Sequence, residues 1–177
     1  SFKGVVDDGW TYLAPETTRI SGVNMGLFMP ESNWEPPTVF PDIRDADIIG
    51  IDTETRDPDL LTKGPSCKRG GGYIVGVSVA TNDGFTGHYP VRHEGGDNLD
   101  APNVFAWLND NLSGTNPKVG ANILYDLEWL ETEGVVVNGA KYDIQVAEPL
   151  LDEDRKTYKL DALANHYLGV SKNEELM

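Results

Sequence analysis

The chain has 177 residues, of which 39% are hydrophobic and 24% are charged, and this composition predicts one globular core. No apolar run approaches the roughly 20 residues of a membrane span, and the N-terminus lacks a basic segment followed by an apolar signal core. A single cysteine, Cys67, excludes an internal disulfide and argues against a structural zinc site. We therefore expect a cytoplasmic protein that has no membrane partner.

A net charge of −15 argues against a broad nucleic-acid surface, because Lys and Arg usually neutralise the phosphates. The charge does not exclude a nuclease that holds phosphate through metal ions, since such a site itself needs carboxylates. The sequence starts at Ser1 without a methionine and stops at Met177 without turn residues. We expect it to be part of a longer protein.

The N-terminal region is rich in proline, which interrupts regular secondary structure. We expect residues 1–44 to form an extended arm, with or without a hairpin, that packs on the rest of the chain. Residues 45–177 are expected to form the globular domain.

The first strand of that domain, expected over residues 45–55, carries two acids set one residue apart. Successive side chains of a strand point to opposite faces, so Asp52 and Glu54 share one face while Ile51 and Thr53 share the other. Two convergent carboxylates are typical of a site for a hard cation such as Mg²⁺. An isolated pair of this kind is also typical of a strand that ends in a polar turn, so the pair alone leaves both interpretations open.

The following elements alternate between loops and short apolar runs. Residues 57–72 are expected to form a solvated surface loop, and contacts of its cations with a phosphate backbone are the alternative. Residues 73–80 and 85–91 predict a β-hairpin. Asp100 is expected to cap a helix, and residues 118–120 are expected to form a short strand.

The next helix presents two stripes. Ile123, Leu127 and Leu130 recur at helical spacing and form an apolar stripe. Asn122 and Asp126 are four residues apart, so the helix is expected to present an amide and an acid side by side on another stripe.

The C-terminal part of the chain predicts a strand at residues 135–137 and a tight turn at 138–139. Helices are expected at 143–151 and 160–168, separated by a charged loop at 152–156 that we interpret as a solvated turn. The order of elements predicts an α/β domain with a mixed sheet flanked by helices.

Two motifs occur here in the order seen in DnaQ-like (DEDD) 3′-5′ exonucleases. The stretch from Ile51 to Thr55 resembles the first exonuclease motif, and the stretch from Val119 to Asp126 resembles the second. The first is a weak signal alone and the second a moderate one, but both in order are a strong signal.

The resemblance continues past the second motif and covers about residues 28–175. Residues 142–151 and 159–168 resemble the corresponding helices in the proofreading domain of family A DNA polymerases. Phage-type members are the most similar, because they share segments like residues 30–34 and 89–96.

This resemblance implies an RNase H-like fold and two divalent metal ions, Mg²⁺ or Mn²⁺. It implies that Asp52 bridges the two metals, that Glu54 binds one of them and that Asp126 binds the other. The implied activity is hydrolysis of the last phosphodiester of a single-stranded or frayed DNA 3′ end, as a proofreading step. Thr55, Asn122 and Tyr125 are then expected to contact the substrate, and the polymerase domain of the same parent chain is the expected partner.

The third motif of the family, a Tyr or His four residues before an Asp, supplies a fourth carboxylate. No Tyr precedes an Asp at this spacing in the sequence, and we interpret the one matching His, His93 before Asp97, as part of a loop. Asp143 and Asp161 are better explained as acids at the starts of helices. We therefore expect weak exonuclease activity from this chain and full activity from the parent protein.

Two alternatives to a proofreading domain remain. One is a stand-alone RNase D-like exoribonuclease, which a polymerase domain in the same open reading frame would exclude. The other is a non-catalytic domain that binds DNA or a protein, which loss of metal binding in an Asp52→Ala variant would argue against.

Overall fold

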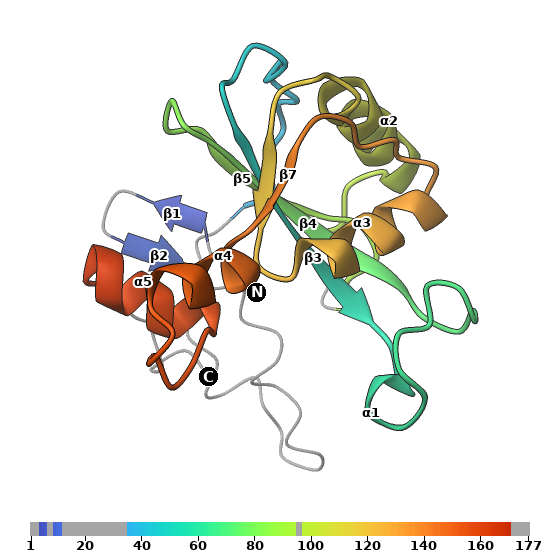
Figure 1. Cartoon of the computed structure of the whole chain (residues 1–177). Helices are drawn as coiled ribbons and strands as arrows, with labels where there is room; N and C mark the ends of the chain where they lie inside the picture. The colour runs from blue at the N-terminus through green and yellow to red at the C-terminus, as the bar shows by residue number, and fades with distance from the viewer. Residues whose placement is uncertain (1–3, 7–8, 12–34, 95–96, 171–177) are drawn as a thin grey trace, which may run out of the picture.

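A computed structural model describes residues 4–6, 9–11, 35–94 and 97–170 of the chain (Figure 1). Its centre is a mixed sheet with the strand order β5-β4-β3-β6-β7. Strands β3, β4 and β5 pair antiparallel, whereas β6 is parallel to β3 and β7 is parallel to β6. The strands are β3 (Ile49–Arg56), β4 (Tyr73–Thr81), β5 (Thr86–Pro90), β6 (Lys118–Gly120) and β7 (Lys141–Asp143).

Helices cover both sides of this sheet (Figure 1). Helices α2 and α3 lie on one side, and α4 and α5 lie on the other. The helices are α1 (Leu60–Lys63), α2 (Ala101–Leu112), α3 (Ile123–Thr132), α4 (Ile144–Leu151) and α5 (Leu160–Leu168). None of the helices in the described ranges is long and apolar enough to cross a membrane.

The hydrophobic core lies between the sheet and the pair α2 and α3. Ile49 and Ile51 of β3 are buried in it, together with Leu108 of α2 and Trp129 and Leu130 of α3. The alternation of burial along β3 agrees with the sequence prediction that Ile51 and Thr53 share one face. The core therefore anchors α3 on one face of β3.

The first strand of the sheet is shifted from its predicted position. It starts at Ile49 rather than at residue 45. The preceding backbone bonds outside the strand ladder: the Ala46 amide donates to the Ile43 carbonyl (3.2 Å), and the Ile48 amide donates to Asn82 Oδ1 (3.3 Å). The predicted loop at residues 57–72 contains the single turn of α1. The predicted hairpin is present as β4 and β5.

The predicted strand at residues 135–137 is wrong, and β7 takes its place in the sheet. Val135 is buried in the core, but the Val136 amide donates to Asn109 Oδ1 (2.9 Å) on α2. This backbone therefore bonds to a helix instead of a neighbouring strand. Strand β7 has three residues and is half-buried or exposed, so it shows no hydrophobic pattern from which sequence could predict it.

The loop at residues 152–156 is more than the solvated turn predicted from its charges. Arg155 Nε lies 2.5 Å from Glu148 Oε1 of α4, and this glutamate is 4% exposed. Tyr167 of α5 donates its hydroxyl to the same carboxylate, at 3.0 Å from each oxygen. A buried ion pair therefore joins the loop to both helices.

The N-terminal region contributes a short antiparallel hairpin, β1 (Gly4–Val6) with β2 (Gly9–Thr11). Residues 12–34, which include the arm segment 30–34 that carries part of the family resemblance, lie outside the described residues.

Candidate metal centre at the end of strand β3

Strand β3 presents its two acids on the face opposite the core. Burial alternates along the strand: Ile51 and Thr53 are buried, and Asp52 and Glu54 between and after them are half-buried. The pairing register with β4 shifts between Glu54 and Thr55, which is the irregularity expected of a β-bulge. The predicted alternation of the acids is therefore present, and the strand ladder is interrupted directly after the second acid.

Helix α3 brings Asp126 to the same strand. The Thr53 amide and the Thr53 hydroxyl both donate to Asp126 Oδ1, at 2.8 and 2.6 Å, across 73 residues of sequence. Strand β6 pairs with β3 only at Ile49 and Gly50, so the Thr53 amide lies beyond the end of that parallel ladder. The carboxylate of Asp126 thus accepts a strand amide that has no β6 partner.

Thr53 is a residue whose role the sequence analysis missed. It was expected only to share the apolar face of Ile51, yet it holds the acid of the second motif through two hydrogen bonds. The one local signal was a hydroxyl at an otherwise apolar position of the strand.

The buried position of Asp126 changes its acidity. Burial raises the pKa of Asp126 to about 7, and the neighbouring Asp52 carboxylate also raises it, while the Thr53 hydrogen bonds act in the opposite direction. Asp52 and Asp126 are therefore close enough to repel each other when both are ionised. A divalent cation between such carboxylates would favour the ionised forms.

Tyr125, one residue earlier on α3, also contacts β3. Its hydroxyl shares a hydrogen bond of 2.7 Å with Thr55 Oγ1. Two successive residues of the second motif are thus joined to two threonines of the first motif, one buried and one half-buried.

Asn122 differs from its prediction. It precedes the first residue of α3, adopts a left-handed backbone conformation (φ 61°, ψ 46°) and is exposed. It is therefore not on a helical stripe beside Asp126, because the helix begins only at Ile123.

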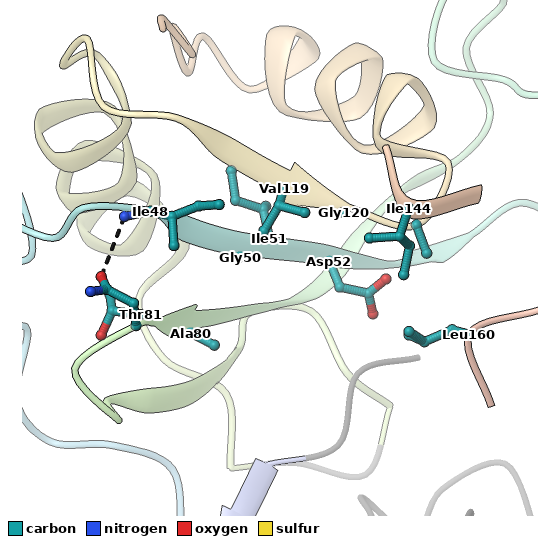
Figure 2. Close-up of a pocket in the computed structure, with 12 residues that line it drawn as sticks. Ile48, Gly50, Ile51, Asp52, Ala80, Thr81, Val119, Gly120, Ile144 and Leu160 are labelled. Atoms are coloured by element: carbon teal, nitrogen blue, oxygen red, sulfur yellow. Dashed lines mark hydrogen bonds between the residues drawn. The ribbon is translucent and has the colours of Figure 1, made fainter. Parts of the chain in front are cut away.

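Asp52 points into a cavity of about 320 Å³ between the sheet and the helices α4 and α5 (Figure 2). Ile144 and Leu160 lie near its carboxylate, and Gly50 and Val119 line the wall along the sheet. The cavity therefore combines one carboxylate with a largely apolar lining.

The donor chemistry of the site suits a hard divalent cation, because Asp52, Glu54 and Asp126 offer only carboxylate oxygens. Both described hydrogen bonds to Asp126 are accepted by Oδ1. Its other carboxylate oxygen, Oδ2, is therefore the better placed of the two to bind a metal ion. Within the described residues, no three His, Cys, Asp or Glu side chains are clustered closely enough to hold a metal. The structure thus brings Asp126 to Thr53, the strand neighbour of Asp52, but does not draw the three predicted ligands into one cluster.

The cations of the loop at residues 57–72 lie in ion pairs within the chain. Each pairs with an acid of this chain, which favours the surface-loop interpretation; the pairs are Lys63 with Asp59, Lys68 with Glu131, and Arg69 with Asp57 and Asp59. Arg56, at the end of β3, pairs in the same way with Glu94.

Solved structures share this fold. The chain superposes on NrnC of Brucella melitensis with bound Mg²⁺ with a TM-score of 0.54 at 16% identity, covering 79% of this chain and 62% of that one. For Pol1 from M. smegmatis in complex with DNA primer-template and dNTP, the TM-score is 0.52 at 17% identity, covering 72% and 20%. The predicted RNase H-like, DnaQ-type fold is confirmed.

Sequence comparison identifies relatives that are longer than this chain. It is 40% identical over 152 residues to a DNA-directed DNA polymerase of Pseudomonas phage M6, covering 82% of this chain and 23% of that protein. It is 28% identical over 135 residues to DNA polymerase I of Pseudomonas aeruginosa, covering 73% and 14%. The chain therefore spans less than a quarter of the length of these relatives.

A family model described as 3′-5′ exonuclease matches residues 30–177, which include both motifs and the five helices that the structure describes. The chain therefore belongs to the 3′-5′ exonuclease domain family of family A DNA polymerases.

Proposed function

We propose that this domain removes nucleotides from the 3′ end of single-stranded or frayed DNA as the proofreading part of a DNA polymerase. The observation that carries the proposal is the docking of Asp126 of α3 on Thr53 of β3, between Asp52 and Glu54 in the strand, in a chain of the 3′-5′ exonuclease family. Glu54 belongs to the proposal because it follows Asp52 on the same face of the strand.

The three carboxylates would hold two divalent cations, Mg²⁺ or Mn²⁺. Asp52 is assigned to both ions, Glu54 to one and Asp126 to the other. When bound, such ions lower the pKa of a coordinated water and neutralise charge that develops on the phosphate. The residues of the chain position the ligands: Thr53 fixes Asp126 on β3, and the strand itself fixes the separation of Asp52 and Glu54.

Contacts with the terminal nucleotide of the substrate are assigned to Tyr125 and Asn122, two other residues of the second motif. The hydroxyl of Tyr125 is held by Thr55 beside the carboxylates, where it can orient a terminal nucleotide. The exposed side chain of Asn122 is available for hydrogen bonds to the same nucleotide.

The partner is the polymerase domain of the same parent chain, because the relatives are DNA polymerases and this chain covers only part of them. The division into an arm, residues 1–44, and an exonuclease domain, residues 45–177, is part of this proposal.

Metal binding is expected to depend on pH through Asp126. A cation binds the ionised carboxylate, and burial raises the pKa of Asp126 to about 7. The apparent affinity for Mn²⁺ should therefore fall by about tenfold between pH 8 and pH 6, as the ionised fraction falls. Calorimetric titration with Mn²⁺ at the two pH values measures this, and the Asp126→Asn variant, which has no titratable carboxyl there, should show a much smaller dependence. Equal wild-type affinities at both pH values would contradict this role of Asp126.

The activity itself is tested by incubating the chain with single-stranded DNA labelled at the 5′ end and Mn²⁺. We expect slow, stepwise shortening from the 3′ end that stops when EDTA removes the metal. A high enzyme concentration is needed, because the sequence lacks a Tyr four residues before an Asp as in the third motif. A matching RNA degraded faster than the DNA would favour an exoribonuclease. Metal-dependent DNA binding without any shortening, in this chain and in the parent protein, would favour a non-catalytic domain.

A further inference from the structure

Asp143 contacts the second motif although it belongs to neither motif. This residue ends β7 and immediately precedes α4. Its Oδ1 accepts hydrogen bonds from the amides of Asn122 (3.0 Å) and Gln145 (2.9 Å), and its Oδ2 accepts one from the amide of Ile123 (3.0 Å). One carboxylate therefore binds the amides that begin two helices.

These contacts replace a cap that α3 lacks. The first amides of a helix have no partner within it, and a side chain at the preceding position usually accepts from one of them. Asn122 occupies that position, but its side chain makes no capping hydrogen bond. Because β7 is paired parallel to β6 with Asp143 beside Gly120, the carboxylate of Asp143 reaches the start of α3 instead.

The consequence concerns Asn122. Its left-handed conformation costs free energy in a residue with a side chain, and the bond from its own amide to Asp143 supports that conformation. Because Asp143 accepts the hydrogen bonds at the start of α3, the side chain of Asn122 is not needed as a cap for this helix. It therefore stays exposed at the start of α3, the helix that carries Tyr125 and Asp126.

We infer that Asp143 is a positioning residue that acts on the nucleic-acid substrate through Asn122. This inference rests on the proposed function. Asp126 and Tyr125 are each held by a threonine of β3, independently of Asp143. Loss of the Asp143 carboxylate should therefore weaken substrate binding and leave metal binding nearly unchanged.

A double-mutant cycle tests the inference, with binding of a fluorescent single-stranded dT oligonucleotide measured by anisotropy in Ca²⁺. Asn122→Ala and Asp143→Asn are each expected to weaken binding by about tenfold, and the double variant should bind no more weakly than either one, because the two residues act as a unit. The affinity for Ca²⁺ should stay within about twofold in all variants. Asp161→Asn is the matched control, since it removes an exposed acid from the first turn of α5 and should bind like the wild type.

A second variant of Asp143 separates loss of the contact with α3 from misfolding caused by loss of the α4 cap. Asp143→Ser keeps a side chain that can cap α4 but is too short to reach the amides of Asn122 and Ile123, so it should weaken binding as Asp143→Asn does. An additive loss of about 100-fold in the double variant, or a parallel loss of Ca²⁺ affinity, would overturn the inference, as would unchanged binding by both Asp143 variants. Absence of binding by the wild type would instead contradict the proposed function, and the inference would fail with it.

Discussion

Replacing Asp52 by Asn is expected to lower the rate of 3′-terminal hydrolysis by at least about 100-fold, because the variant loses the charge that both proposed cations share. The side chain keeps its shape, and its position on β3 at the wall of the cavity suits an amide as well as a carboxylate. The fold should therefore remain intact, with a thermal midpoint close to that of the wild type. Release of 3′ nucleotides in Mn²⁺ is the measurement.

The matched control is Asp45→Asn, which removes the same charge from an exposed residue before β3. It should hydrolyse DNA at the wild-type rate. Equal rates for Asp52→Asn and Asp45→Asn would contradict the assignment of Asp52 as a metal ligand.

A second readout of the same variant does not depend on activity. The Asp52 carboxylate is one of the causes that raise the pKa of Asp126, although burial is the larger one. Removing the charge of Asp52 should therefore lower the pKa of Asp126 below about 7 without returning it to its ordinary value. A titration of the Asp126 carboxyl carbon by NMR would measure the change, and an unchanged pKa would show that the two carboxylates are further apart than the structure places them.

Replacing Arg155 by Met is expected to lower the free energy of unfolding by about 3 kcal/mol, because it leaves the carboxylate of Glu148 buried without its cation. The arginine side chain is 13% exposed and the glutamate side chain 5%, so water cannot substitute well for the lost partner. The Tyr167 hydroxyl remains as a neutral donor to that carboxylate. Urea unfolding followed by circular dichroism measures the loss.

Lys156→Met is the control, since Lys156 is the exposed cation next to Arg155 in the same loop. It should change the free energy of unfolding by less than about 0.5 kcal/mol. The double variant Glu148→Met/Arg155→Met should be more stable than Arg155→Met alone, because no unpaired charge is then buried. A single variant as stable as the wild type would show that the pair is solvated, as the charge pattern of the loop had suggested.

Local patterns in the sequence predicted much of the fold and the candidate site. Alternation along β3 placed Asp52 and Glu54 on the face opposite Thr53, and the structure has the same arrangement. The apolar stripe with Ile123 and Leu130 on α3 was also predicted correctly, because helix geometry repeats every 3.6 residues and the side-chain pattern follows it. The amide-and-acid stripe of Asn122 and Asp126 was not, because α3 begins only after Asn122. Two short motifs in the expected order predicted the family, and the comparison with the family model confirmed it.

The contacts that complete the site could not be read from such patterns. Thr53 holds Asp126 across 73 residues, and Asp143 holds Asn122 across 21. Hydrogen bonds between distant segments impose no periodicity on the sequence, and β7, at the edge of the sheet, buries too little to show one. The residue types in the motifs thus indicated the chemistry, whereas the packing of α3 and the pairing of β7 beside β6 determined which groups support it.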